Sequence, residues 1–475
     1  DRKRTTNVRL KLPAERWTRG FAAAGLMTGA LAPTPALSFF EGITDVNGHH
    51  TNTIVGNNQT IGTDNSRYIG AATSLNVYAG EHTHIQQPSA AASALFRCGG
   101  CMGPTQVGGS ITSNGLLFMQ NGSGFLLGPS SVVDAASVTM SSLNITNQDF
   151  QNGILRFTQD PNYANAAVVN QGVITAGPGG YVALLGAAVR NEGVIVANLG
   201  SIAMAAGKAA TLDMRGDGLI EFVVTDAVSG SVTGPNGESL ASYVSNTGTL
   251  QADGGMVTLT ASAATDIIKS VVNNEGVIRA QSMTERNGVV VLSGGNEGIV
   301  SVSGTIDASG TGGGQTGGTV HVLGEKVGLF DHANITVSGD AGGGTVLVGG
   351  DLHGQGTVQN AFRTYVSADS TINADALTNG NGGKVVVWAD DVTRYYGSIS
   401  ARGGAQSGDG GFVEVSGERL LDFHGKADLS APNGANGTLL LDPANIEIST
   451  NAAANQTGFA PPGDQTEAFG DDAAA

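Results

Sequence analysis

One short pattern recurs along most of this chain: a run of alternating apolar residues, a glycine-rich turn, and a second alternating run. It is seen in NEGVIVANLGSIAMAAG, which starts at Asn191, and in ANITVSGDAGGGTVLVGG, which starts at Ala333. Its nine copies begin at Asn170, Asn191, Asn246, Asn274, Val302, Ala333, Ser370, Gly397 and Lys426. Such repetition restricts the chain to folds built from stacked equivalent units, because one unit cannot bury its apolar face alone.

The spacing of the repeats selects among those folds. The glycine that opens a unit recurs after 28 residues from Gly248 to Gly276, and after another 28 at Gly304. The step from Gly193 to Gly248 is 55 residues, which fits two units and a loop. A propeller blade needs about 40 residues and four strands, and these units are too short for that. The spacing therefore favours the coils of a parallel β-helix, and we expect an all-β chain that forms a right-handed parallel β-helix. Its less regular N-terminal part would be a cap, because a stack must not present an open strand edge at its end.

The residues inside one unit explain how it would wind. Ile306 alternates with polar neighbours, and so does Val320 in the following run, so that each strand sends one set of side chains inward. Successive units would then stack these small branched side chains on one another. We expect Gly317 and Gly318 to supply positive φ at the corner between the strands. Valine at either position should cost more stability than a change at an outward threonine.

The charge balance argues against one class of partner. The chain carries 40 acidic and 23 basic side chains, a formal net charge of -17. Binding to nucleic-acid phosphates depends on clustered lysine and arginine, so we expect no nucleic-acid partner.

The first residues have a different character from the rest. Seven basic residues between Arg2 and Arg19 precede the apolar run FAAAGLMTGALA, and small residues follow at Ala36 and Ser38. This order is typical of a secretory signal peptide, and the run is too short to span a bilayer. We therefore expect residues 1–38 to form an extended signal peptide, and the protein to be exported through the periplasm.

The chain has two cysteines, Cys98 and Cys101, in the sequence CGGC. Such a pair can be a redox motif at a helix start, half of a zinc site, or a small disulfide loop. The glycines around it disfavour a following helix, and no second CxxC completes a zinc set. His82 and His84 share a face of the nearest strand and are the residues that could in principle add to a metal site. A structural disulfide is the favoured interpretation, and we expect no metal and no cofactor.

The sequence before the repeats is less regular and carries small motifs in a fixed order. These are Gly80-Glu81, Gln87-Pro88-Ser89, Arg97, Gly99-Gly100, Gly109-Ser110-Ile111, Ser113-Asn114-Gly115 and the closing Gly128, and they are followed by LNITNQDF at residues 143–150, which is expected as a turn. In this order, residues 75–146 resemble the N-terminal secretion domain of filamentous haemagglutinin-type exoproteins. Those are the secreted halves of two-partner secretion systems in Gram-negative bacteria. Stretches from Asp213, Gly382 and Gly437 also resemble that family.

One motif departs from the family. Its hallmark turn is Asn-Pro-Asn-Gly-Ile, and the matching residues here are Asn121, Gly122, Ser123, Gly124 and Phe125. An Asn-Gly-Ser-Gly sequence can still form a tight turn. The resemblance implies that these five residues, together with Gln87, Pro88 and Ser113-Asn114-Gly115, belong to the secretion motifs.

The resemblance also implies a layout and a route. Residues 39–165 would form the secretion domain with its cap, residues 166–448 the β-helix shaft, and residues 449–475 a disordered tail of a truncated chain. The chain would engage the periplasmic POTRA domains of a dedicated outer-membrane β-barrel, pass through it unfolded, and wind into the helix outside. It would then act as a secreted or surface-displayed adhesin that binds a host-cell or surface glycan or protein receptor.

Two alternatives stay open. The first is a toxin or haemolysin of the same export route, whose effector part is missing here. The second is a polysaccharide-degrading β-helix, which needs carboxylates that converge on one groove. Asp390 and Asp391 are adjacent, and adjacent residues of a strand point to opposite faces. We therefore expect the protein not to be an enzyme.

Overall fold

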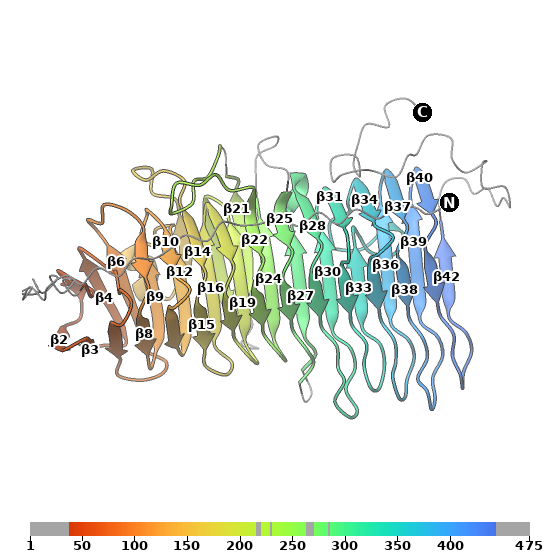
Figure 1. Cartoon of the computed structure of the whole chain (residues 1–475), viewed down its shortest axis with the longest axis horizontal. Helices are drawn as coiled ribbons and strands as arrows, with labels where there is room; N and C mark the ends of the chain where they lie inside the picture. The colour runs from red at the N-terminus through yellow and green to blue at the C-terminus, as the bar shows by residue number, and fades with distance from the viewer. Residues whose placement is uncertain (1–37, 215–219, 229, 263–269, 284–285, 443–475) are drawn as a thin grey trace, which may run out of the picture. The chain divides into compact units, whose positions relative to one another are not determined.

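A computed structural model describes residues 38–214, 220–228, 230–262, 270–283 and 286–442. The described residues wind into parallel coils, and from β7 to β40 each coil adds one strand to each of three long sheets (Figure 1). The predicted parallel β-helix is therefore confirmed. Among the described residues the helices are short, α1 (Asn147–Asn152), η1 (Gly295–Glu297) and η2 (Leu352–Gly354), and none is long and apolar enough to cross a membrane.

Within the described residues the first and third sheets have 14 strands each and the second has 11. The first sheet runs in the order β1 (Thr44–Asn47), β4 (Arg67–Ala72), β6 (Ser93–Cys98), β9 (Leu116–Gln120), β12 (Ser137–Ser141), β16 (Tyr181–Gly186), β19 (Ser201–Ala206), β24 (Met256–Ala261), β27 (Val289–Ser293), β30 (Thr319–Leu323), β33 (Thr345–Val348), β36 (Lys384–Ala389), β39 (Phe412–Gly417) and β42 (Thr438–Leu441). The second sheet runs in the order β7 (Thr105–Val107), β10 (Phe125–Leu127), β14 (Ala167–Asn170), β17 (Ala188–Asn191), β22 (Ser242–Asn246), β25 (Ser270–Asn274), β28 (Ile299–Val302), β31 (Lys326–Leu329), β34 (Arg363–Val366), β37 (Val392–Tyr395) and β40 (Leu420–Phe423). The third sheet runs in the order β2 (His50–Val55), β3 (Asn58–Thr63), β5 (His82–Gln86), β8 (Ser110–Ser113), β11 (Val132–Ala135), β15 (Val173–Ala176), β18 (Val194–Val196), β23 (Thr249–Gln251), β26 (Val277–Arg279), β29 (Thr305–Asp307), β32 (Asn334–Thr336), β35 (Thr371–Asn373), β38 (Ser398–Ser400) and β41 (Lys426–Asp428).

The core is a set of side-chain ladders that run from coil to coil. In the third sheet, Ile278, Ile306 and Ile335 pair in parallel register, and each is fully buried. The next positions of the same ladder are Ile372 and Ile399. Each coil thus buries its branched side chains against those of its neighbours, as the alternation in the sequence predicts. The expected inward side chains of the following strand, such as Val320, are fully buried too.

Close approach between coils explains the corner glycines better than positive φ does. Neither Gly317 nor Gly318 has a positive φ, so that part of the expectation was wrong. A Cβ on Gly317 would collide with the carbonyl oxygen of Val337, and one on Gly318 with the carbonyl oxygen of Gly288. Glycine is required at these positions because the backbone of the next coil occupies the space of a side chain.

The 55-residue interval from Gly193 to Gly248 contains one coil with an excursion, and not the two coils that the spacing predicted. Strand β18 pairs directly with β23, so the coil of Gly193 is followed by the coil of Gly248. The intervening chain leaves the stack and forms β20 (Ala209–Met214) and β21 (Ile220–Asp226), which pair antiparallel. Spacing alone did not distinguish an excursion from an additional coil.

A ladder of buried asparagines, which sequence reasoning missed, joins four coils of the second sheet. Asn170, Asn191, Asn246 and Asn274 are each fully buried. Each side-chain amide donates to the side-chain oxygen of the next, at 2.8 Å in all three steps. A stack of identical amides satisfies its own donors and acceptors, which permits burial of polar groups inside a corner. The signal was present, because these four asparagines open the first four repeats.

The pairing changes at the N-terminal end of the stack. Strand β1 pairs antiparallel with β4, and β2 pairs antiparallel with β3. Phe40 is 1% exposed, and its ring meets that of Phe96 edge-on at 5.2 Å. These antiparallel strands and the Phe40 ring close this end of the coil core.

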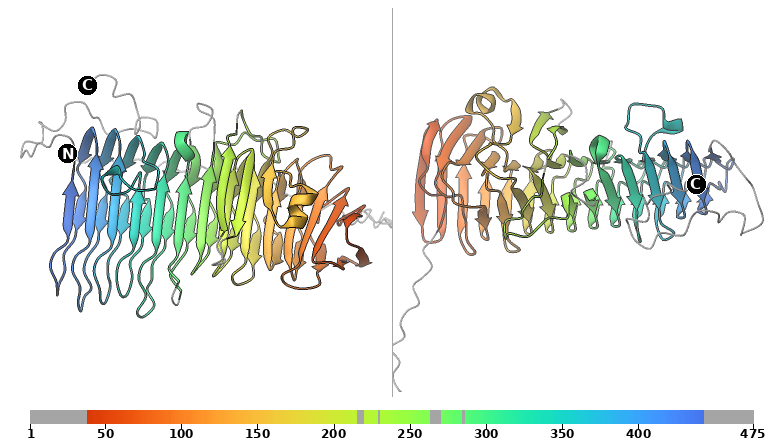
Figure 2. Two further views of the ribbon diagram at one scale, coloured as in Figure 1. Left: turned by 180° about the vertical axis from the view of Figure 1, so that it is seen from behind. Right: turned by 90° about the horizontal axis from the view of Figure 1, so that it is seen from above.

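An outer layer covers the first sheet near this end, as Figure 2 shows for α1. It consists of α1, β13 (Leu155–Thr158), β20 and β21, and β13 pairs antiparallel with β20. Beneath it lies a second apolar core that is separate from the coil core and includes Leu95, Phe118, Phe150 and Leu212. The motif of residues 143–150, expected as a turn, contains the start of α1. Thr146 caps this helix by accepting a hydrogen bond from the Asp149 N–H.

Candidate functional site

The candidate site is the region where the motif residues named above meet the outer layer. Gln87 directly follows β5. One coil later, Ser113 ends β8, and Asn114 and Gly115 lie between β8 and β9. The Asn121 turn, which we define as residues 121–124, connects β9 to β10. Asn114-Gly115 and the Asn121 turn are successive corners of one coil, and Gln87 lies at the corner of the preceding coil that is equivalent to Asn114-Gly115.

The first corner is closed by two reciprocal hydrogen bonds. The Gln87 backbone N–H donates to the side-chain oxygen of Asn114 at 2.7 Å, and the Asn114 amide donates to the Gln87 carbonyl at 2.9 Å. The Gln87 side chain donates to the hydroxyl of Ser113 at 2.9 Å. A Cβ on Gly115 would lie 2.6 Å from Cδ of Gln87. The corner therefore locks two neighbouring coils together, whereas Pro88 is exposed beside it.

The Asn121 turn is held by the side chain of Asn121 itself. This residue is fully buried; its amide donates to the Gly103 carbonyl at 3.0 Å and to the Thr105 hydroxyl at 2.9 Å. Its side-chain oxygen accepts from the Ser123 N–H at 2.9 Å. The Gly124 N–H donates to the Asn121 carbonyl at 2.8 Å, which closes a four-residue turn.

The glycines of the turn have different requirements. Gly124 has a φ of 91°, a conformation that side chains rarely adopt, and a Cβ there would collide with the Ala167 carbonyl oxygen. Gly122 has no positive φ, but the ring of Tyr163 lies against it. Phe125 follows the turn and is fully buried in the coil core.

These contacts limit what the motif can do in the folded chain. Gln87, Asn121 and Phe125 are almost completely inaccessible, and the polar contacts described above join Gln87 and Asn121 to neighbouring coils. The arrangement can align coils and close corners. It offers a partner little to contact beyond Pro88 and the half-buried Asn114 and Ser123.

Cys98 and Cys101 are joined by a disulfide, with their Cα atoms 5.7 Å apart. Cys98 is the last residue of β6 and is buried. The chain that follows this small loop supplies the Gly103 carbonyl to Asn121. The disulfide therefore lies next to the acceptor that holds the Asn121 turn.

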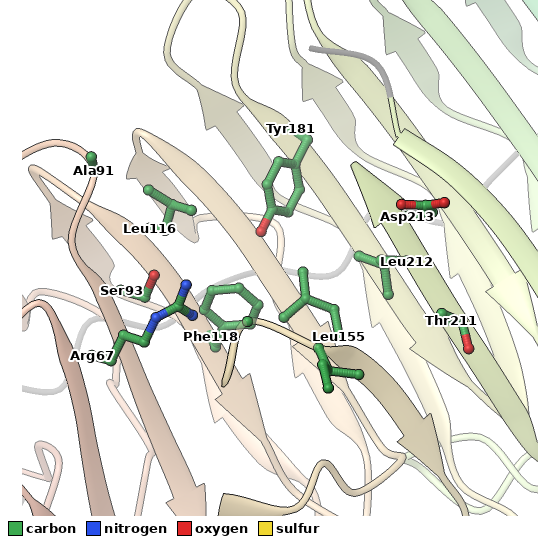
Figure 3. Close-up of a pocket in the computed structure, with 12 residues that line it drawn as sticks. Arg67, Ala91, Ser93, Leu116, Phe118, Leu155, Tyr181, Thr211, Leu212 and Asp213 are labelled. Atoms are coloured by element: carbon green, nitrogen blue, oxygen red, sulfur yellow. The ribbon is translucent and has the colours of Figure 1, made fainter. Parts of the chain in front are cut away.

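A groove of about 670 Å³ lies beside the outer layer, between the first sheet and β20 (Figure 3). Its walls are mainly apolar, and Figure 3 shows Arg67 reaching toward the Phe118 ring at one end and Asp213 at the other. The Arg67 guanidinium donates to the Phe150 carbonyl at 3.0 Å, which ties α1 to β4. Burial raises the pKa of Tyr181, on the groove wall, to about 12, so this phenol stays neutral. Sequence reasoning did not find this groove, because its residues come from six separate segments.

A second arginine, Arg97 on β6, links the first sheet to the outer layer. Arg97 donates to the Ile145 carbonyl and to the side-chain oxygen of Asn147, at the start of α1. Burial lowers the pKa of its guanidinium, although arginine remains charged at neutral pH. Arg97 was among the family motifs, and its position explains why an arginine is useful there.

Asp390 and Asp391, the two carboxylates considered for polysaccharide cleavage, do not point into one groove as a catalytic pair. Asp390 and Asp391 lie between β36 and β37 and not within a strand as expected. The Asp390 carboxylate accepts from the Trp388 indole at 2.8 Å, while Asp391 forms ion pairs with Arg363 and Arg419. Over the part of the chain that the structure describes, no three metal-binding side chains form a cluster.

Comparisons with known proteins agree on the same family. A family model described as the TPS secretion domain matches residues 47–310. The crystal structure of the HMW1 secretion domain from Haemophilus influenzae superposes with a TM-score of 0.72 at 30% sequence identity, and the match covers 85% of this chain and 100% of that chain. No curated protein matches the sequence.

Proposed function

The chain belongs to the two-partner secretion family of exoproteins, which cross the outer membrane with a dedicated transporter, and on that premise we propose that it is a surface-displayed adhesin. The folded coils would provide the attachment surface after export. The secretion domain would first serve the transport step. In this proposal the chain carries out no catalysis.

The continuity of the coils is the observation that carries the proposal. The family match runs from Asn47, in β1, to Gly310, and the same three sheets continue without a change of architecture to β42. Each described coil rests on the one before it, so folding can proceed by adding neighbours, with no long-range search. This suits a chain that leaves a pore as an unfolded thread and folds outside.

The attachment role rests on what the coils leave exposed. On the outer face of the third sheet, Val132, Val173 and Val194 follow one another in register and are 37–41% exposed. A regular outer face of this kind can present repeated contacts to a glycan or protein receptor. The receptor itself is not specified by these residues.

Co-expression tests the export step. The chain, with its own N-terminal segment, would be expressed in a Gram-negative host with and without the outer-membrane transporter of its system. We expect folded chain in the medium or on the cell surface only when the transporter is present. Equal release without the transporter would contradict the proposed route.

A binding assay tests the attachment step separately. Purified chain on beads would be incubated with host cells and, separately, with a glycan array. The surface variant Val173→Lys would be measured beside wild type. Saturable binding that the variant weakens supports an adhesin. Lysis of the cells would instead support the toxin or haemolysin alternative, and cleavage of polyuronates would support an enzyme.

A further inference from the structure

The contact between Gly122 and Tyr163 points to a role for Tyr163 that no motif assigns. Residues 159–166 connect β13 of the outer layer to β14 of the coils, and they cross the Asn121 turn on the way. The sequence Asp160-Pro161-Asn162-Tyr163 forms a turn of its own. The Tyr163 N–H donates to the Asp160 carbonyl at 3.1 Å, and the Asn162 N–H donates to the Asp160 carboxylate at 2.9 Å. Proline at the second position makes this turn stiff, which fixes where the Tyr163 ring points.

The ring occupies the space that a side chain at position 122 would need. A Cβ built on Gly122 would lie 2.5 Å from Cγ of Tyr163 and 2.6 Å from Cδ2. Position 122 is where the hallmark turn of the family carries proline. A proline at 122 and the Tyr163 ring in its present place are therefore mutually exclusive.

The turn needs such a constraint because its own sequence is flexible. Gly122 and Gly124 flank Ser123, and glycine loses more conformational freedom on folding than any other residue. Proline would restrict the turn through its ring, which fixes φ. An aromatic ring packed on Gly122 restricts the same backbone by excluded volume.

We propose that Tyr163 is a positioning residue for the Asn121 turn, and that its ring takes over the role of the missing proline. The proposal rests on the proposed function, in which this turn belongs to the export motifs. Because Tyr163 lies 41 residues after Gly122 (163 − 122), the turn becomes rigid only when the outer layer has docked. Export of this chain then depends on the Gly122–Tyr163 pair through folding of the segment that has left the pore, and not on either residue alone.

Hydrogen exchange on the purified full chain tests the local claim. We expect Tyr163→Ala to speed exchange of the Ser123 and Gly124 amides roughly tenfold, and Tyr163→Phe to leave it unchanged, because the ring and not the hydroxyl makes the contact. Tyr396→Ala, in a distant coil, is the matched control. Unchanged exchange at residues 123 and 124 in Tyr163→Ala would overturn the proposal.

A double-mutant cycle tests the replacement of proline directly. We expect Gly122→Pro alone to lower the melting temperature, because the new ring meets Tyr163. The Gly122→Pro/Tyr163→Ala double variant should melt higher than Gly122→Pro alone, and also higher than Tyr163→Ala alone. Additive losses in the double variant would overturn the proposal, and this comparison remains valid even if Tyr163→Ala folds poorly.

The same variants in the co-expression assay separate this inference from the proposed function. If wild type is not exported by the transporter, the proposed function fails while the exchange and melting results stand. If wild type is exported, we expect Tyr163→Ala to reduce export several-fold and the double variant to restore it. Export of Tyr163→Ala at the wild-type level would exclude a positioning role in export.

Discussion

The first sheet is buried differently in two regions of the stack. From β4 to β19 the outer layer covers its outer face, so that Leu95 and Phe118 are buried in a second core. From β24 to β30 that face is open, and Thr258 and Val291, in the same outward row as Phe118, are half-exposed. We call these the clad region and the bare region. The coil fold determines only the inner face, and the outer face is free to acquire a function.

The difference also shows where the chain tolerates irregularity. The clad region contains the Asn121 turn, the groove and the excursion between Gly193 and Gly248. The bare region keeps short corners in which glycines let neighbouring coils meet. We expect each region to fail by its own mechanism, and the following predictions run from the largest effect to the smallest.

The largest effect is expected at a corner of the bare region. Gly318→Val places a side chain against the Gly288 carbonyl oxygen, and relief of this clash would require the coils to separate. We expect a loss of roughly 3 kcal/mol or more, measured by thermal melting followed by circular dichroism. Gly313→Val is the control, because a Cβ there meets nothing within 4 Å. Equal melting of the two variants would show that close coil contact does not limit this corner.

The next prediction compares two positions of the same outward row of the first sheet, Phe118 in the clad region and Val291 in the bare region. Phe118→Ala empties part of the outer core, and we expect it to cost about 3–4 kcal/mol. Val291→Ala, in the bare region, should cost less than about 1 kcal/mol because its side chain is already half in water. Chemical denaturation of both variants measures the difference. Similar losses would mean that the outer layer adds little stability.

A moderate effect is expected in the asparagine ladder. Asn246→Leu keeps the branch at Cγ but leaves the Asn191 amide and the Asn274 side-chain oxygen without their ladder partner. We expect a loss of about 2 kcal/mol, the cost of unsatisfied buried polar groups. Asn273→Ala, whose side chain is half-exposed and bonded to Glu275, should change stability by less than about 0.5 kcal/mol. A neutral Asn246→Leu would mean that the ladder is replaceable by apolar packing.

The smallest effect is electrostatic and lies toward the C-terminal coils. Burial alone would raise the pKa of Asp391, but the hydrogen bonds and charges of Arg419 and Arg363 outweigh it and hold the pKa below its ordinary value. A depressed carboxyl pKa contributes stability above the unfolded pKa, about 3.9, and loses it as pH falls through the folded pKa. We expect wild type to lose about 1 kcal/mol more than Asp391→Asn between pH 6 and pH 3. Parallel pH profiles of the two proteins would contradict this.

Much of the site could be anticipated residue by residue, but not its contacts. The order of the motifs identified the family, and Asn121 and Gly124 indicated a tight turn. The partners of that turn, Gly103, Thr105 and Tyr163, lie on other segments, and no pattern along the chain connects them. The groove and the outer layer were missed for the same reason, because their residues meet only after the chain leaves the coils and returns.

The sequence by itself determined the winding of this protein. A parallel coil needs only local instructions, namely inward alternation and small residues at corners, and both repeat visibly along the chain. The tertiary structure decided which glycines are obligatory, which asparagines pair and what covers the outer face. Those outcomes depend on the carbonyl or ring that a neighbouring coil or returning segment brings into contact, and that is a property of the stacked molecule.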